Sequence, residues 1–366
     1  MTSGQRSIPA LDPSTTAPRM SIELTNICNL HCSYCLRDED DLYHNKAEFF
    51  PVELLRKVVR RAKETYGVTY VSFTGGEVTI HPQFEQVIAA VAEEGLQISF
   101  VTNGWHFDRV YPVILRHRGA VRLVAFSLDG ATREAHDHWR GEGSFVRVVR
   151  AITRCHASNI RFILKVGIRR DTVPQIQDIA FFAARLGAAG LHFAHLLPTS
   201  AAMEKESALS LQERRAAEQE ISIVSSIFKM PVGIVTGYYN IDPSAPCTAL
   251  LGKTCNVDFH GRLSLCCNLS GFRGAVEEQE VVADLTQEDF AVGYERLLQV
   301  AEQQNERRRQ ALADFEARGS EVDLYTSSPC LFCLQSFGKT PWRTAANTAD
   351  LLPRSLPVIQ TPASAT

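Results

Sequence analysis

The 366-residue sequence lacks several features that would assign it to a class at once. It has no run of about 18 apolar residues, so we expect no membrane-spanning helix. Its first residues, MTSGQRSIPALDPSTTAP, lack the continuous apolar segment of a secretory signal peptide. Its net charge is only −3, far from the strong positive charge of a protein that binds nucleic acid or an anionic membrane. These absences favour a cytoplasmic globular protein with neither nucleic acid nor a membrane as partner.

Cysteine, in contrast, is abundant, with 10 residues in the chain. Thiols stay reduced in the cytoplasm, so this number indicates metal or redox chemistry rather than disulfides. Cys155 lies in a helical pattern and is predicted to be a buried thiol. The other cysteines form an N-terminal group at 28, 32 and 35, and a C-terminal group at 247, 255, 266, 267, 330 and 333.

The chain between the two cysteine groups alternates strand and helix patterns. The predicted strands are rich in β-branched and aromatic residues and end near Gly, Asn, Asp or Pro. They cover residues 21–27, 68–74, 96–102, 121–127, 161–168 and 191–197, and the clearest helical patterns cover 51–67, 84–95, 144–158, 173–187 and 209–229. This alternation predicts an α/β fold, a partial (β/α)6 TIM-like barrel. Loops at the C-terminal ends of its strands are where we expect the chemistry.

The sequence ICNLHCSYCLRD places Cys28, Cys32 and Cys35 just after the first strand. Three cysteines at this spacing can hold a [4Fe–4S] cluster and leave one iron open to another ligand. A zinc site with His31 or His44 as fourth ligand is an alternative. A disulfide with one spare thiol is another, but it fits a reducing compartment poorly. The spacing favours the open cluster.

The second strand ends in SFTGGEV, residues 72–78. Gly75 and Gly76 permit a close backbone approach and leave main-chain groups for a ligand, and Glu77 can accept a hydrogen bond from an amine. By itself a Gly-Gly-Glu sequence can be an ordinary tight turn. After CxxxCxxC at the end of the preceding strand it is far more specific. Together the two motifs resemble those of the radical S-adenosylmethionine (SAM) superfamily, over about residues 21–200.

The resemblance implies an enzyme. Cys28, Cys32 and Cys35 would hold the catalytic cluster, and SAM's amino and carboxylate groups would bind its fourth iron. In this family an electron from the reduced cluster cleaves SAM into methionine and a 5′-deoxyadenosyl radical, which abstracts hydrogen from a C–H bond. We therefore expect a radical SAM oxidoreductase supplied by an external donor such as flavodoxin or ferredoxin.

The resemblance also implies which residues contact SAM. Tyr34 matches the position beside the adenine, and Gly75, Gly76 and Glu77 match the motif that binds the amino group. The strand ends add candidates for the ribose and carboxylate, which could instead be turn residues. These are Asn103, Ser127 and Asp129, and Leu196 is either beside the adenine or a core leucine.

The C-terminal cysteines surround the sequence VDFHGRLSL, residues 257–265. It reads as a hairpin with His260 and Gly261 in a two-residue turn. That register would place Cys255 directly opposite Cys266, with Cys267 on the other face. A zinc ribbon completed by Cys330 and Cys333 is the simplest structural interpretation.

Behind a radical SAM barrel, this block resembles the Twitch or SPASM extension, which binds auxiliary iron–sulfur clusters. Cys247, Gly261 and Cys266 match the family spacing, and the short cysteine series favours Twitch, with one auxiliary [4Fe–4S] cluster. Cys266, Cys330 and Cys333 are its expected ligands. Family spacing favours Cys247 as the fourth ligand, whereas the hairpin geometry favours Cys255; we prefer Cys247.

Four segments follow from these patterns. Residues 1–19 and 344–366 are predicted to be disordered, 20–229 to form the radical SAM barrel and 230–343 a small α+β cluster domain. The expected function is oxidative modification or cross-linking of a ribosomally made peptide. A radical dehydrogenase for a small sugar-like or aminocyclitol-like molecule is the alternative. A non-enzymatic iron–sulfur electron carrier is a third possibility, against which the Gly-Gly-Glu motif argues.

Overall fold

The computed structural model describes residues 18–245, 247–273 and 278–343. Its centre is one ten-stranded sheet, in the order β10-β9-β8-β1-β2-β3-β4-β5-β6-β7. Neighbouring strands from β1 to β7 are parallel, so this part is the wall of a partial barrel. The barrel strands are β1 (Arg19–Glu23), β2 (Tyr70–Thr74), β3 (Gln97–Thr102), β4 (Val121–Ser127), β5 (Phe162–Ile168), β6 (Leu191–His195) and β7 (Val232–Ile234).

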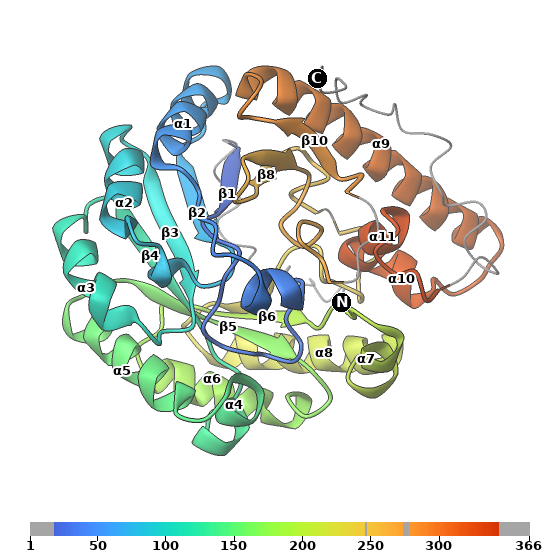
Figure 1. The fold of residues 1–366 in the computed structure, drawn as a ribbon. Coiled ribbons are helices and arrows are strands. Elements are labelled where there is room, and N and C mark those ends of the chain that lie inside the picture. Colours follow the sequence, from blue (N-terminus) through green and yellow to red (C-terminus); the bar gives the residue numbers. More distant parts are fainter. Residues whose placement is uncertain (1–17, 246, 274–277, 344–366) are drawn as a thin grey trace.

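Helices cover the outside of the barrel (Figure 1). Because the strands are parallel, each chain return must cross over the sheet, and helices make these crossovers. They are α1 (Val52–Tyr66), α2 (Phe84–Glu93), α3 (Phe107–Arg116), α4 (Arg133–Arg140), α5 (Ser144–Ala157), α6 (Ile176–Arg185), α7 (Ala201–Glu206) and α8 (Leu211–Ile227). Short 3₁₀ or π turns cover Asp40–His44, Val78–Ile80 and Val173–Gln175.

Alternation along each strand separates two environments. In β5, Leu164 and Val166 point outward and are buried under helices. Lys165 and Gly167, between and after them, point into the interior of the barrel. On the helix side, α1 buries Leu55, Val58, Val59 and Ala62, which recur at helical spacing on one face. The apolar core therefore lies between strands and helices, and polar side chains are left for the barrel interior.

The predicted strands and helices are confirmed, with shifted ends. All six predicted barrel strands and the five helical patterns correspond to elements of the structure. β1 begins at Arg19, the last residue of the segment predicted to be disordered. Residues 1–17 of that segment and the predicted tail 344–366 lie outside the described residues. Short helices such as α4 and α7 have too few apolar positions to give a clear sequence pattern.

The C-terminal part continues the barrel sheet. β8 (Thr254–Val257) pairs in parallel with β1, and β9 (Arg262–Ser264) and β10 (Val281–Asp284) add antiparallel strands. The long α9 (Phe290–Ala317), α10 (Leu324–Ser327) and α11 (Pro329–Ser336) lie together on this side (Figure 1). β7, at the opposite end of the sheet, pairs with β6 and so belongs to the barrel wall.

The predicted register of the β8–β9 hairpin is wrong by one residue. Val257 pairs with Leu263 and Asn256 with Ser264, so Cys255 does not face Cys266. The turn has three residues instead of two: the Gly261 N–H donates to the Asp258 carbonyl at 2.9 Å, and Gly261 has φ +88°. A three-residue loop that ends in a left-handed glycine is a common hairpin type. Each one-residue slip moves every side chain to the other face.

No helix in the described part of the chain is long and apolar enough to cross a membrane.

Candidate functional site

The N-terminal cysteine loop leaves β1 at its C-terminal end and folds back over the barrel. The Cys35 N–H donates to the Cys32 carbonyl at 3.0 Å, and the Cys28 N–H to the Leu42 carbonyl at 3.3 Å. The pKa of Cys28 is raised to about 12, mainly by burial. The charge of Glu77 raises this pKa further, and so, to a smaller extent, do Cys32 and Cys35. The three thiols are therefore near enough to influence one another, although they come from an irregular loop.

The two glycines after β2 are required by this loop. A Cβ atom on Gly76 would lie 1.8 Å from the Ile27 carbonyl oxygen, and one on Gly75 would lie 2.6 Å from that of Thr25. The N–H groups of Gly76 and Glu77 donate to the carbonyls of Thr25 and Ile27, both at 2.9 Å. We expected free main-chain groups here, but these two N–H groups hold the cysteine loop against β2.

Glu77 is buried and accepts four hydrogen bonds. Its Oε1 accepts from the Thr79 N–H at 3.0 Å, the Thr79 hydroxyl at 2.6 Å and the Thr102 hydroxyl at 2.7 Å. Its Oε2 accepts from the Asn103 N–H at 2.8 Å. The carboxylate thus joins the ends of β2 and β3 directly below the cysteine loop. Its position is fixed before any ligand binds.

Asn103 lies against the cysteine loop. Its side-chain Nδ2 is 3.1 Å from Asn29 Oδ1 and 3.9 Å from Cys28 Sγ. Its Oδ1 accepts from the Trp105 N–H at 2.9 Å, which is a turn interaction. Asn103 therefore serves as a turn residue and also contacts a predicted cluster ligand.

Asp129, in the loop after β4, is bound by Tyr34 and two arginines. The Tyr34 hydroxyl and Arg140 Nε both donate to Asp129 Oδ2, and Arg169 Nη1 donates to Oδ1 at 3.0 Å. Burial would raise the pKa of Asp129, but Arg140 and Arg169 outweigh it and hold this pKa well below its usual range. Two predicted SAM contacts, Tyr34 and Asp129, therefore lie in direct contact.

The sequence analysis missed both arginines and Trp139. The Arg169 guanidinium lies 4.8 Å from the centre of the Tyr34 ring and 4.2 Å from that of Trp139. Arg140 Nη1 lies 4.0 Å from Cys32 Sγ. Arg169 follows β5 directly, so its place at a strand end was the available signal. Arg140 ends α4, and nothing in the sequence connects it with Asp129.

Ser127 and Leu196 are farther from this cluster. Ser127 is the last residue of β4 and pairs with Lys165, on the interior face of the barrel. Leu196 follows β6 and is buried, and its carbonyl accepts from Arg214 Nη2 at 2.8 Å. In the described part of the chain, no side-chain hydrogen bond or ion pair joins either residue to Tyr34 or Asp129.

The residues around the cysteine loop fit a cluster with SAM. Three thiols converge there, and Arg169 Nη2 is buried with no hydrogen-bond partner among the described residues, as an unfilled carboxylate partner would leave it. Within the same residues, no three Cys, His, Asp or Glu side chains are arranged to share one metal ion. The donor set is that of an iron–sulfur cluster with an open position.

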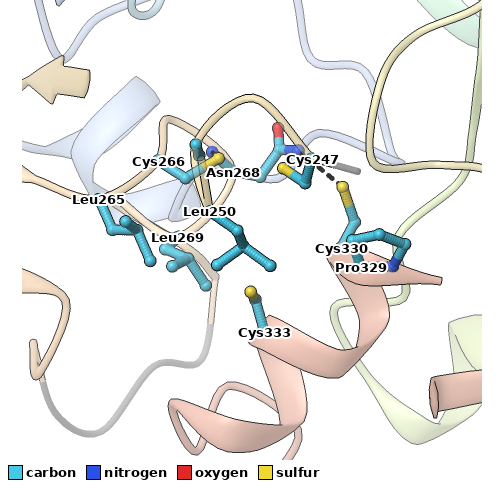
Figure 2. Close-up of a pocket in the computed structure, with 10 residues that line it drawn as sticks. Cys247, Leu250, Leu265, Cys266, Asn268, Leu269, Pro329, Cys330 and Cys333 are labelled. Atoms are coloured by element: carbon cyan, nitrogen blue, oxygen red, sulfur yellow. Dashed lines mark hydrogen bonds between the residues drawn. The ribbon is translucent and has the colours of Figure 1, made fainter. Parts of the chain in front are cut away.

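The C-terminal cysteines Cys247, Cys266, Cys330 and Cys333 line one pocket with mostly apolar neighbours. In Figure 2, Cys330 and Cys333 project from one helix, α11, and Cys266 and Cys247 come from the opposite side. The two α11 cysteines share a face because they are three residues apart. Four thiols from three separate segments therefore surround one small space.

Nearby polar groups aim at these sulfurs. Asn268 Nδ2 lies 3.6 Å from Cys330 Sγ, and the Asn268 N–H donates to Cys266 Sγ at 3.4 Å. Gln304 Nε2 lies 4.0 Å from Cys333 Sγ. Gly237 makes room, since a Cβ atom there would lie 2.9 Å from Cys330 Sγ. Such donors would stabilise thiolates and tune the potential of a cluster.

Cys255, Cys155 and Cys267 do not line this pocket. Cys255 is buried in β8 with its thiol 3.9 Å from the Arg19 carbonyl, outside the pocket. Cys155 lies on the buried face of α5, and burial raises its pKa to about 12. The pKa of Cys267 is lowered mainly by a hydrogen bond with Cys266, although burial acts in the opposite direction. The positive charges of Arg37 and Lys165 also lower this pKa. Cys267 thus lies between Cys266 and two cations, Arg37 of the N-terminal loop and Lys165 of β5.

Three comparisons place this chain among known proteins. Residues 22–183 match the family model of the Radical SAM superfamily. Mycofactocin maturase MftC of Mycobacterium tuberculosis is 30% identical over 240 residues, which are 63% of this chain and 57% of that protein. An AdoMet-dependent heme synthase of Oleidesulfovibrio alaskensis is 28% identical over 197 residues, 53% of this chain and 49% of the synthase. The chain thus spans only about half the length of these relatives.

Among solved structures, Streptococcus suis SuiB bound to S-adenosylmethionine resembles this chain with a TM-score of 0.61 at 14% identity. The similarity covers 76% of this chain and 65% of SuiB. SuiB was also solved bound to its precursor peptide SuiA. At this identity the similarity is one of fold.

The segment that matches the Radical SAM family model, residues 22–183, runs from the end of β1 past β5 of the parallel barrel and contains the cysteine loop at its strand ends. Proteins of that family bind a [4Fe–4S] cluster together with SAM.

Proposed function

We propose that this protein is a radical SAM enzyme that oxidatively modifies or cross-links a ribosomally made peptide. When bound, the cluster supplies an electron that cleaves SAM, and the resulting 5′-deoxyadenosyl radical takes hydrogen from a C–H bond of the substrate. The contacts that join the cysteine loop to the end of β2 support this proposal most directly. They bring CxxxCxxC and Gly-Gly-Glu together, as that chemistry requires.

In this proposal Cys28, Cys32 and Cys35 hold the catalytic cluster. Gly75, Gly76 and Glu77 lie beside the amino group of SAM, and Tyr34 lies beside its adenine. The polar groups at the strand ends orient the rest of SAM: the unsatisfied Arg169 Nη2 is suited to a carboxylate, and Asn103, Ser127 and Asp129 are the candidates for its ribose and carboxylate. A fixed, hydrogen-bonded Glu77 keeps this arrangement pre-organised.

Cys247, Cys266, Cys330 and Cys333 would hold one auxiliary [4Fe–4S] cluster of the Twitch type. Their common pocket supports this assignment, and it favours Cys247 over Cys255 as the fourth ligand. Four cysteine ligands leave no open iron, so this cluster would accept an electron from the substrate radical. A flavodoxin or ferredoxin would supply the electron that starts each turnover. Segment 230–343 would thus be the oxidising part of the enzyme.

The proposal of a peptide substrate is based on the names of the relatives and of the similar structures. MftC is named a maturase, and SuiB was solved with a precursor peptide. A small-molecule substrate is the second candidate, favoured by the similarity to a heme synthase. Short peptides encoded near this gene can be used to distinguish a peptide substrate from a small-molecule substrate. After incubation with enzyme, SAM and reductant, one of them should lose hydrogen atoms by mass spectrometry, and this loss should be absent if the substrate is a small molecule.

SAM cleavage tests the enzyme itself. The protein reconstituted with iron and sulfide without oxygen should form 5′-deoxyadenosine when a strong reductant is added. The Cys28→Ala, Cys32→Ala, Cys35→Ala triple variant should lose this activity together with about four irons per chain. Cys155→Ala is the matched control, because Cys155 is a buried thiol on α5. This variant should keep both the SAM cleavage and the iron. Cleavage by the triple variant at the wild-type rate would refute the assignment of the catalytic cluster.

A further inference from the structure

Beneath the proposed SAM contacts, the barrel interior contains a second row of polar side chains. Strand pairing places Ser127 beside Lys165 and Lys165 beside His192, across β4, β5 and β6. Two residues further along β5, Gly167 faces the Tyr34 ring and Asp129. Because residues i and i+2 lie on one face of a strand about 6–7 Å apart, the Lys165 row is one step deeper in the barrel than the Tyr34–Asp129 contact.

Most cations of the interior are already paired. Arg140 and Arg169 bind Asp129, and Arg37 binds Glu23 at 2.9 Å. Lys165, in contrast, has no hydrogen bond or ion pair within the described residues, although it is half-buried. A partly desolvated ammonium group without an anion is unfavourable, and accordingly burial lowers the pKa of Lys165. The row therefore contains a positive charge without a hydrogen-bonded carboxylate among the described residues, and Cys267 is the anionic group that acts on it.

His192 adds an unused donor or acceptor next to this charge. Its Nδ1 is buried without a partner among the described residues. Burial lowers the pKa of His192 to about 4, with Lys165 as the second cause, so the ring is neutral at pH 7 and can donate from one nitrogen. Cys267 faces the same space from the C-terminal loop, as its charge interaction with Lys165 indicates. The row thus lies between the N-terminal and C-terminal cysteine sites.

We infer that Lys165 and His192 bind a carboxylate group of the substrate and hold it between the two cysteine sites. This inference rests on the proposed function, and it adds a chemical requirement for the substrate: an anionic group close to the reacting carbon. Lys165 supplies the charge, and His192 supplies a second, neutral hydrogen bond to the other oxygen. The next pair on the same face, Gly167 and Ala194, has small side chains.

Peptide pools provide a test that requires no turnover. Three pools of synthetic pentapeptides are mixed with the reconstituted protein, and bound peptides are identified by mass spectrometry after gel filtration. One pool has a free C-terminal carboxylate and no Asp or Glu. The second has an amidated C-terminus with Asp or Glu inside. The third is amidated and has Asn or Gln in those positions, so it has the same shapes without the charge.

The wild-type protein should retain roughly tenfold or more peptide from the first or the second pool than from the third. The preferred pool shows whether the bound carboxylate is at the chain end or on a side chain. Lys165→Met should abolish this preference, and Lys165→Arg should keep part of it, since the charge remains. Lys229→Met, at an exposed lysine, is the control and should behave as wild type. Equal retention of all pools by the wild type, or an unchanged preference in Lys165→Met, would overturn the inference.

The proposed function is judged separately in the same preparations. Formation of 5′-deoxyadenosine depends on the catalytic cluster, whereas the pool preference is measured without turnover. Loss of SAM cleavage with an intact preference would therefore refute the enzyme assignment and keep the carboxylate site. The reverse result would keep the enzyme and refute the site.

Discussion

At the scale of single residues, two neighbouring cysteines have different surroundings. Cys266 lies in the pocket with Cys247, Cys330 and Cys333, whereas Cys267 interacts with Arg37 and Lys165 of the barrel. Both are half-buried, and they have the same chemistry. They differ in position: Cys266 lines the pocket, whereas Cys267 begins the turn that follows β9 and lies between Cys266 and the cations Arg37 and Lys165.

This contrast gives the first prediction. Cys266→Ala should remove the auxiliary cluster and lower the iron content by about four per chain, because it deletes a ligand. Cys267→Ala should retain the iron, because Cys267 is not among the residues that line the pocket. Iron and sulfide analysis of the two reconstituted variants checks this. Equal iron loss from both would mean that the loop after β9 has a different orientation.

Buried histidines give a second prediction at this scale. His195, on β6, is buried with its Nε2 3.1 Å from Glu218 Oε1. Burial lowers the pKa of His195 to about 4, below its ordinary value of 6.5, and Glu218 opposes this shift only in part. The unfolded chain therefore binds a proton at this residue between pH 6.5 and 4, and the folded chain does not. The free energy of unfolding should fall as the pH falls through this window.

The contribution of His195 should be on the order of 3 kcal/mol at pH 4. Urea unfolding of His195→Gln, which keeps a donor for Glu218, should show a smaller loss of stability between pH 7 and pH 4 than the wild type. His138→Gln, at an exposed histidine, should show the wild-type loss. The same slope in His195→Gln and wild type would contradict a neutral buried His195.

At the scale of elements, the C-terminal site depends on a turn as well as on α11. Gly237 has φ +90°, and its carbonyl accepts from the Cys330 N–H at 2.9 Å and from the Ser328 hydroxyl at 3.1 Å. A Cβ atom there would lie 3.4 Å from Cys247 Sγ and nearer still to Cys330 Sγ. The turn after β7 thus fixes the start of α11 and also limits the space around two cysteines.

Gly237→Ala should therefore damage the auxiliary site specifically. A left-handed φ costs an alanine about 1–2 kcal/mol wherever it occurs. Gly143→Ala is the matched control, because Gly143 has φ +81° and nothing within 4 Å of an added Cβ. Both variants should lose similar stability in thermal unfolding, but only Gly237→Ala should lose auxiliary iron. Full iron content in Gly237→Ala would show that the pocket can expand.

At the scale of the whole molecule, one sheet connects the two cysteine sites. β1, which leads into the N-terminal cysteine loop, pairs with β2 on one side and with β8 on the other. Arg37 of that loop also donates to the carbonyl of Ser270, close behind Cys266. The C-terminal part is thus built onto the barrel edge, so a substrate in the interior would lie near both sites.

Removing both α11 cysteines should separate the two activities. The Cys330→Ser, Cys333→Ser double variant should lose the auxiliary cluster and still form 5′-deoxyadenosine, since Cys28, Cys32 and Cys35 are unchanged. Conversion of the substrate to an oxidised product should stop for want of an electron acceptor. Iron analysis and product mass spectrometry check both parts, and circular dichroism verifies folding. Oxidised product at the wild-type rate would refute the electron-acceptor role.

The sequence by itself determined the barrel and the position of its chemistry. Strand and helix periodicities are local properties, so six strands and five helical segments could be predicted from short windows. CxxxCxxC and Gly-Gly-Glu each follow a strand, and parallel strands bring their C-terminal ends to one edge. The contact between the two motifs therefore required only the strand order.

The tertiary structure decided what depends on distant segments or on one residue of register. The three-residue turn at Gly261 moved Cys255 away from Cys266, and the pocket contains Cys247 in its place. Arg140 lies beside Asp129, and Lys165 beside His192, only because separate elements pack together. A side chain's direction after a turn, and its partners across the barrel, arise from packing of the entire chain, which no local sequence pattern encodes.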